Sequence, residues 1–188
     1  GPRTFNLDGD LGRHITIGDH ILDSVSIPRV DIFSHTMLDQ PLTPHEWLAQ
    51  AIFALAHRGL NLSGAVFVTG LVIAASFVLV FRESVDRSSS ILISLGVTIL
   101  AAAASSLHWL SRPHVFTFLF LSIWVSLHER VRCGKRTPLW IFGFVMLLWS
   151  NTHGAFISGF VIWGAYLGGE LFEAWQSKHW PVERLRTW

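Results

Sequence analysis

Four long stretches of the chain contain no Asp, Glu, Lys or Arg. They run over residues 59–81, 88–111, 113–128 and 137–169. The hydrocarbon core of a bilayer is about 30 Å thick, and an α-helix needs about 20 apolar residues to cross it. Only 14% of the 188 residues are charged, and the mean hydropathy is +0.44. The sequence therefore predicts a membrane protein.

These uncharged stretches predict about five membrane spans. Residues 59–81 and 88–111 each fit one helix. Residues 113–128 are shorter, and we expect them to span with about one turn added at an end. Residues 137–169 are too long for one helix, and the polar segment 150–154 at their middle predicts two helices that meet at a polar turn. The expected fold is all-α, a polytopic transmembrane helix bundle preceded by an N-terminal exocytoplasmic segment of interfacial amphipathic helices.

The basic residues of the loops predict which side faces the cytoplasm. They lie in alternate connections, which are the loop with Arg82 and Arg87, residues 130–136 and the C-terminal tail. Basic loops stay in the cytoplasm. We therefore expect a multi-pass protein of the inner (plasma) membrane with a cytoplasmic tail. Its two parts are an exocytoplasmic segment, residues 1–58, and a transmembrane bundle with cytoplasmic basic loops, residues 59–188.

This topology gathers most of the polar residues on the exocytoplasmic side. Eight of the ten histidines and seven of the thirteen acids lie on or near that side. Trp109 and Trp149 are expected at its interface, as in the aromatic belts of membrane proteins. An exposed segment also carries polar residues simply because water surrounds it, so the clustering alone assigns no function.

The first predicted helix of the exocytoplasmic segment covers residues 10–24. Its apolar residues are spaced three and four apart, which indicates an amphipathic helix that lies along the membrane interface. Asp8 or Asp10 would stand at its N-terminus, where the helix dipole favours a carboxylate by about 0.3 to 1 kcal/mol. Helix capping is therefore an alternative to a catalytic role for either acid.

A second helix is predicted after a non-helical stretch that contains Pro28 and Pro41. Thr43, Pro44 and Glu46 match a capping box with proline at the first helical position, and the helix continues through HEWLAQAIFALAHRG. Glu46 would then have a structural role whether or not it also has a chemical one.

Five short motifs follow one another along the chain. They are DGDLGRHITIGDHIL, SIPRVDIFSHT, HEWLAQ, SRPHVFT and WSNTHGAFISG. In this order they resemble the first half of bacterial polytopic proteins of the GT-C glycosyltransferase class, relatives of protein O-mannosyltransferases and of the oligosaccharyltransferase catalytic subunit. The resemblance implies a helix bundle whose first exocytoplasmic loop carries an acid just after the first span, and Asp8 and Asp10 match that place. The family also has a span before this acid and further helices later on, so we expect the printed sequence to represent about half of such an enzyme.

The resemblance implies that a sugar is transferred from a polyprenyl-phosphate donor at the exocytoplasmic face. Such a reaction needs a base for the acceptor hydroxyl and positive charge for the departing phosphate. By analogy, the candidate catalytic residues are Asp8, Asp10 and Glu46, with Asp10 as general base or metal ligand and Asp8 as its partner. Asp8 and Asp10 could together hold a divalent cation, Mg or Mn.

The candidate substrate-binding residues come from several motifs. Arg112 stands at the outer end of a predicted span, where it could meet a lipid phosphate or simply extend to the headgroups. Asn151 and His153 are candidates because polar residues at membrane depth usually face the bundle interior, although they could also satisfy the backbone of a helix turn. The full set is His14, His45, Arg112, His114, Asn151 and His153.

Three functions remain open from the sequence. The first is a membrane glycosyltransferase whose partners are a lipid-linked sugar donor and membrane lipids. The second is a non-catalytic integral membrane subunit that assembles with other protein subunits in a larger complex. The third is a transporter, although the chain has no repeated half that would suggest inverted symmetry. A net charge of +1 gives no basic field for nucleic acid, so none is expected as a partner.

Overall fold

The computed structural model describes residues 9–178 and is all-α within that range. A single isolated bridge, Val30 to Pro41, is the only β-pairing among these residues. The predicted fold class is therefore confirmed at the level of an all-helical protein. The elements are α2 (Asp10–Ser24), α3 (Trp47–Ser88), α4 (Ile91–Ser105), η1 (Ser106–His108), α5 (Val115–Arg132), α6 (Leu139–Thr152), η2 (Gly154–Phe156) and α7 (Ile157–Ser177).

Three helical segments of the described chain are long and apolar enough to cross a membrane. They are α3, α4 with η1, and η2 with α7. Helix α6 is apolar but shorter, and the last turn of α5 carries Glu129, Arg130 and Arg132. These features fit a membrane protein, while the number of spans beyond three stays a prediction. The predicted pair of helices around residues 150–154 is present as α6 and α7.

Helix α3 consists of two arms separated by a kink. Leu60 and Asn61 have non-helical dihedral angles, with φ of 54° and ψ of −149° at Asn61. A Cβ atom on Gly64 would lie 2.0 Å from the Ala56 carbonyl oxygen, so the arms meet too closely for any larger residue. The kink lies where the sequence predicts that an interfacial helix gives way to the first span.

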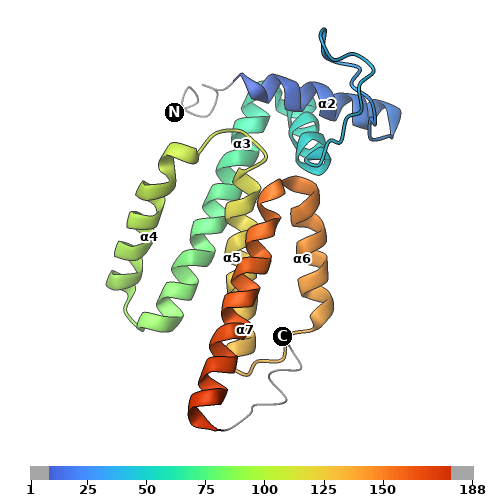
Figure 1. The fold of residues 1–188 in the computed structure, drawn as a ribbon. Coiled ribbons are helices and arrows are strands. Elements are labelled where there is room, and N and C mark those ends of the chain that lie inside the picture. Colours follow the sequence, from blue (N-terminus) through green and yellow to red (C-terminus); the bar gives the residue numbers. More distant parts are fainter. Residues whose placement is uncertain (1–8, 179–188) are drawn as a thin grey trace.

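Helix α2 lies across one end of the bundle and packs on the first arm of α3 (Figure 1). Its bounds match the predicted amphipathic helix. Leu11 and Ile15 are buried in the same apolar cluster as Phe53. A Cβ atom on Gly18 would lie 2.1 Å from the Gln50 carbonyl oxygen, so glycine allows the two helices to touch. The apolar face of α2 is thus covered by protein.

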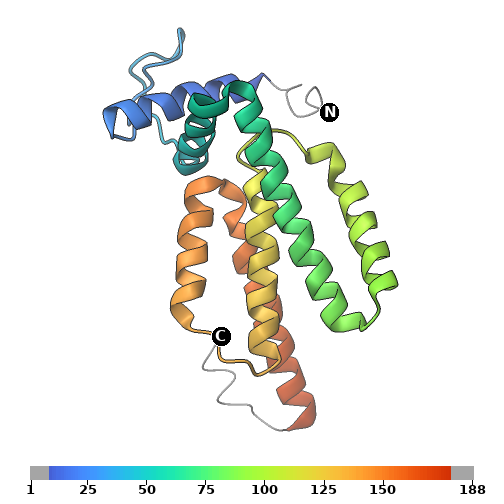
Figure 2. The same ribbon diagram turned by 180° about the vertical axis from the view of Figure 1, so that it is seen from behind.

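Helix α5 is the centre of the bundle and contacts α3, α6 and α7 (Figures 1 and 2). Its buried side chains include Phe120, whose ring stacks on Trp149 with a centroid distance of 6.2 Å. Trp149 is fully buried, so its indole packs inside the bundle and does not face lipid as an aromatic-belt residue would. The cause is the orientation of α6, which turns this indole toward α5. By contrast, α4 packs mainly on α3, and Ser94 is its one buried residue.

The predicted capping box at the start of α3 does not form. The Pro44 carbonyl accepts a hydrogen bond from the Trp47 amide at 3.1 Å, and the Thr43 carbonyl accepts one from the His45 amide at 2.9 Å. These tight turns delay the helix until Trp47. Glu46 is the residue before it, and its side chain makes no capping bond. The carboxylate is therefore available for contacts with other elements.

Candidate functional site

Most of the predicted site residues meet at the end of the bundle that α2 covers. They surround a cavity of about 410 Å³, which we call the α2-end cavity. Its walls come from α2, the turn before α3, the η1–α5 corner and the bend between α6 and α7. The lining residues are Asp10, Arg13, His14, Glu46, His108, Leu110, Arg112, Pro113, His114 and His153.

An ion pair joins α2 to the η1–α5 corner across this cavity. Asp10 is the first residue of α2 and does not cap the helix. Its Oδ2 atom lies 3.0 Å from Nη2 of Arg112, and both side chains remain partly exposed. A carboxylate and a guanidinium therefore face the same space, where Arg112 could bind an anion and Asp10 could orient it. Asp8 lies outside the described residues, so the predicted Asp8–Asp10 pair and its divalent cation stay predictions.

Glu46 is the most enclosed acid of the cavity, with its side chain 15% exposed. Its Oε1 atom lies 3.7 Å from Nε2 of His153 and 3.9 Å from Nε2 of His45. Burial raises the pKa of Glu46 above its ordinary value, and the charges of His45 and Arg13 oppose part of that shift. A carboxylate with a raised pKa is a better proton acceptor near neutral pH than an exposed one.

A chain of hydrogen bonds fixes the ring of His153. The Trp149 indole can only donate, and it donates to Oγ1 of Thr117 at 3.2 Å. The Thr117 hydroxyl then donates to Nδ1 of His153 at 3.0 Å, and the Ala155 amide donates to the same nitrogen at 3.3 Å. Because Nδ1 accepts, the proton of the neutral ring belongs on Nε2, which faces Glu46.

Two further histidines line the cavity in different surroundings. His114 Nε2 donates to the His108 carbonyl at 2.6 Å, and its ring centroid lies 6.3 Å from that of His153. His14 is 3% exposed. Burial lowers the pKa of His14 to about 4, and the Arg13 guanidinium acts in the same direction. His14 is therefore neutral at pH 7.

Two predicted substrate-binding residues lie outside the cavity wall. The Asn151 side chain accepts from the Trp47 indole at 2.6 Å and donates to the Leu147 carbonyl at 2.7 Å. It thus ties the start of α3 to the end of α6. His45 lies beside Glu46 with its side chain 63% exposed.

The structure adds Arg13, His108 and Thr117 to the residues in or around the site. A signal for Arg13 exists in the sequence, because Asp10, Arg13 and His14 share one face of a helix at spacings of three and four. His108 contributes its backbone carbonyl, which no side-chain pattern indicates. Thr117 sits in an apolar stretch and is recognised only from its contacts.

Comparisons of the chain with models of protein families, with curated proteins and with solved structures give no match. The likeness to GT-C glycosyltransferases therefore rests on the five motifs. The function has to be argued from the chemistry of the α2-end cavity.

Proposed function

We propose that this chain belongs to a membrane glycosyltransferase that transfers a sugar from a polyprenyl-phosphate donor to an acceptor hydroxyl at the exocytoplasmic face. The observation that carries the proposal is the α2-end cavity, which combines two acids, Asp10 and Glu46, with two arginines, Arg13 and Arg112. A proton acceptor and a phosphate-binding cation are the two groups that this reaction requires.

The proposed chemistry assigns a part to each group. The acceptor hydroxyl attacks the anomeric carbon of the sugar, and the carbon–oxygen bond to the donor phosphate breaks. The phosphate leaves with the electron pair, and Arg112 and Arg13 stabilise its charge. Glu46 takes the hydroxyl proton, because its burial and its contact with His153 suit a base.

We do not assign Asp10 as the base, because its carboxylate already forms an ion pair with Arg112. It positions the Arg112 guanidinium and, with Asp8, would contribute oxygen ligands to a divalent cation. His14 and His114 would contact the substrate from the cavity wall. Asn151 and His45 would act indirectly, through Trp47 and Glu46.

The proposal also assigns an orientation in the plasma membrane. Helices α3, α4, α5, α6 and α7 would be the five spans, with the α2-end cavity on the exocytoplasmic side. The arrangement of charge supports this, because one cavity at the ends of α3 and α5 is lined by Arg82, Arg87, Arg130 and Lys135. These helix ends lie opposite α2 (Figure 1). Basic residues gather on the cytoplasmic side of membrane proteins.

The test is sugar transfer by membranes that contain the full-length protein, supplied with a panel of polyprenyl-phosphate-linked hexoses. Glu46→Gln should lower the rate by about 10²-fold or more, as loss of a general base does. The Asp8→Ala, Asp10→Ala double variant should also lose transfer. Asp39→Asn is the matched control, since Asp39 is an exposed loop residue that does not line the cavity. Full activity in the double variant would refute the proposal.

A second candidate is a non-catalytic subunit of a larger membrane complex. It is favoured by α4, whose apolar surface is almost entirely uncovered within the described chain. In that case the chain should copurify with its partners in fixed stoichiometry. The helix faces that are exposed in the isolated chain should then be protected from lipid-soluble labels.

A further inference from the structure

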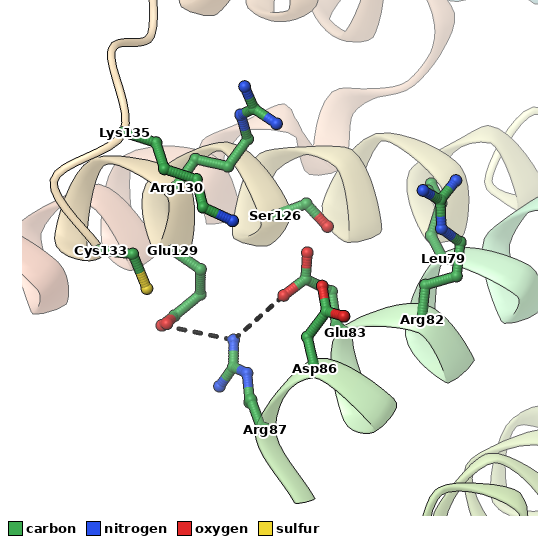
Figure 3. Close-up of a pocket in the computed structure, with 10 residues that line it drawn as sticks. All are labelled: Leu79, Arg82, Glu83, Asp86, Arg87, Ser126, Glu129, Arg130, Cys133 and Lys135. Carbon is green, nitrogen blue, oxygen red and sulfur yellow. Dashed lines mark ion pairs between the residues drawn. The ribbon is translucent and has the colours of Figure 1, made fainter. Parts of the chain in front are cut away.

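A second cavity lies at the end of the bundle opposite α2, between the last turns of α3 and the end of α5 (Figure 3). Its volume is about 480 Å³, and we call it the basic-end cavity. Charged side chains from both helices line it. The glycosyl-transfer proposal makes no use of this cavity, so the argument that follows is independent of that proposal.

Two of its three lining acids form ion pairs within the protein. Arg87 lies between them, with Nη2 3.6 Å from Oε2 of Glu83 and 3.4 Å from Oε1 of Glu129 (Figure 3). Arg132 and the Tyr166 hydroxyl also contact Glu129. These contacts join α3, α5 and α7, and they orient both carboxylates toward Arg87.

Three lining cations make no ion pair with any described residue. They are Arg82, Arg130 and Lys135, and the remaining lining acid is Asp86. The lining residues include four cations and three acids, so the cavity carries a net charge of +1, and three of its cations lie outside the Arg87 ion pairs. An anion bound there would be attracted by charges that the fold itself leaves uncompensated.

The backbone holds two of these cations side by side. Helix α5 ends in a Schellman motif, in which the Lys135 amide donates to the Arg130 carbonyl at 2.9 Å and the Gly134 amide donates to the Val131 carbonyl at 2.8 Å. Gly134 has φ of 71°, a conformation that favours glycine. The chain turns back over the helix end, so the Lys135 and Arg130 side chains lie next to each other at one side of the cavity (Figure 3).

A hydrogen-bond donor also points into this space. Most serines and threonines of these helices bond to a carbonyl one turn earlier, as Ser122 does to Phe118 at 2.8 Å. The Ser126 hydroxyl is buried and has no hydrogen-bond partner in the described chain. Figure 3 shows it directed away from Lys135, on the side of the Glu83 carboxylate. Buried hydroxyls usually find a partner, and a bound ligand would supply one here.

We propose that the basic-end cavity binds a phosphate group, held by Lys135, Arg130 and Arg82 and accepting a hydrogen bond from Ser126. Cations with a hydroxyl donor are typical phosphate ligands. Helix α3, which is long enough to cross a membrane, ends at this cavity, so the cavity lies at the level of lipid headgroups. The phosphodiester of an anionic phospholipid such as phosphatidylglycerol is therefore the expected source, with a soluble phosphate as the other source of the same chemistry.

The test is lipid retention by the purified full chain, measured by native mass spectrometry after incubation with phosphatidylglycerol or with phosphatidylcholine. The wild-type protein should retain phosphatidylglycerol preferentially. The Arg130→Gln, Lys135→Gln double variant should lose at least about tenfold in affinity, as expected when charge-assisted hydrogen bonds are removed. The Arg136→Gln, Lys178→Gln variant removes the same charge from exposed residues at this end and should behave as wild type.

A second measurement distinguishes a lipid phosphate from a soluble phosphate. Inorganic phosphate at millimolar concentration is added to the detergent-purified protein, and the shift in unfolding temperature is measured. A stabilisation that the double variant lacks supports a phosphate site open to soluble anions, whereas retention of phosphatidylglycerol without this shift supports a lipid site. Should the double variant fail to fold, Arg82→Gln on the opposite wall replaces it. The proposal is overturned if neither probe distinguishes wild type from the folded variants.

Discussion

His14 and Glu46 face the same cavity, and burial moves their pKa values in opposite directions. Burial disfavours the charged form of each group, so the pKa of His14 falls to about 4 and that of Glu46 rises. Ionisation of Glu46 thus costs stability as the pH rises above the ordinary carboxyl range. Protonation of His14 costs stability as the pH falls. The neutral forms of both groups fit the fold best.

The first prediction concerns the pH dependence of stability. Burial lowers the pKa of His14 from 6.5 to about 4. The stability that the neutral ring contributes to the fold is therefore complete above pH 6.5 and is lost as the pH falls from 6.5 to about 4. Between pH 7.5 and 4.5 this loss is on the order of 2 to 3 kcal/mol. His14→Gln should reduce the pH sensitivity of thermal unfolding in detergent by that amount. His35→Gln, an exposed loop substitution, should not, and equal sensitivity in His14→Gln and wild type would contradict the assignment.

The second prediction concerns the tautomer of His153. In the wild-type protein, ¹⁵N NMR of labelled histidine should give the Nε2–H form of the neutral ring, because Thr117 and Ala155 both donate to Nδ1. Thr117→Val leaves the Ala155 amide as the remaining described donor to Nδ1, so the share of the Nδ1–H tautomer should rise. The variant should also cost about 1 to 2 kcal/mol, since the Trp149 indole loses its acceptor. Thr117→Ser should restore the wild-type spectrum.

Thr98→Val is the control for this experiment, because within residues 9–178 the Thr98 hydroxyl bonds only to the Ser94 carbonyl of its own helix. A His153 spectrum that stays unchanged in Thr117→Val would show that Thr117 does not set the tautomer. This measurement does not depend on whether the protein transfers sugar.

The sequence predicts that the site residues lie at one end of the bundle, but it does not predict which side chains contact one another. Charge-free stretches and basic loops place Asp10, Arg112 and His153 at one end of the bundle, and the structure brings them around one cavity. The contact of Glu46 with His153 depends on a turn that ends before Trp47, where the sequence indicates a capping box. Short turns and helix rotation are set by tertiary packing, so residue spacing alone does not determine them.

At the scale of elements, the position of α2 determines the shape of the α2-end cavity. The helix is held against the first arm of α3 by apolar packing and by Arg58, which bonds to the carboxylates of Asp19 and Asp23 at 2.7 Å each. Gly18 lies at the closest approach, where a Cβ atom would collide with the Gln50 backbone. Any side chain there must push α2 away from α3.

The third prediction compares two glycines of α2. Gly18→Ala should lower the free energy of unfolding by about 1 to 3 kcal/mol, because a methyl group is forced against a backbone carbonyl. A Cβ atom on Gly12 would meet no other atom within 4 Å. Gly12→Ala should therefore be neutral or stabilising by up to about 1 kcal/mol, since alanine favours the helix. Thermal unfolding of both variants measures the difference. Equal effects would mean that α2 does not pack as described.

Predictability also differs among the elements. The bounds of α2 follow from a clear apolar period, and the bend between α6 and α7 follows from a polar turn within an apolar stretch. The burial of Trp149 does not follow from its position, because an indole near the end of an apolar helix can face lipid or protein equally well by sequence pattern. Its stacking on Phe120 is a result of packing between helices.

At the scale of the whole molecule, the bundle has two chemically different ends. One end carries the α2-end cavity with its acids, histidines and Arg112, and the other carries the basic-end cavity. Helices α3, α5 and α7 run between these ends (Figures 1 and 2). In the proposed function a membrane separates these ends, with the α2-end cavity outside and the basic end in the cytoplasm.

The fourth prediction tests this separation with cysteine labelling. Cys133 is the one cysteine of the sequence and is exposed at the basic end. A second protein carries Cys133→Ser together with His35→Cys, which places the thiol in the exposed loop next to α2. A membrane-impermeant maleimide should label Cys133 only in inverted vesicles and the His35→Cys protein only in right-side-out vesicles. Labelling of both thiols from the same side would contradict the account.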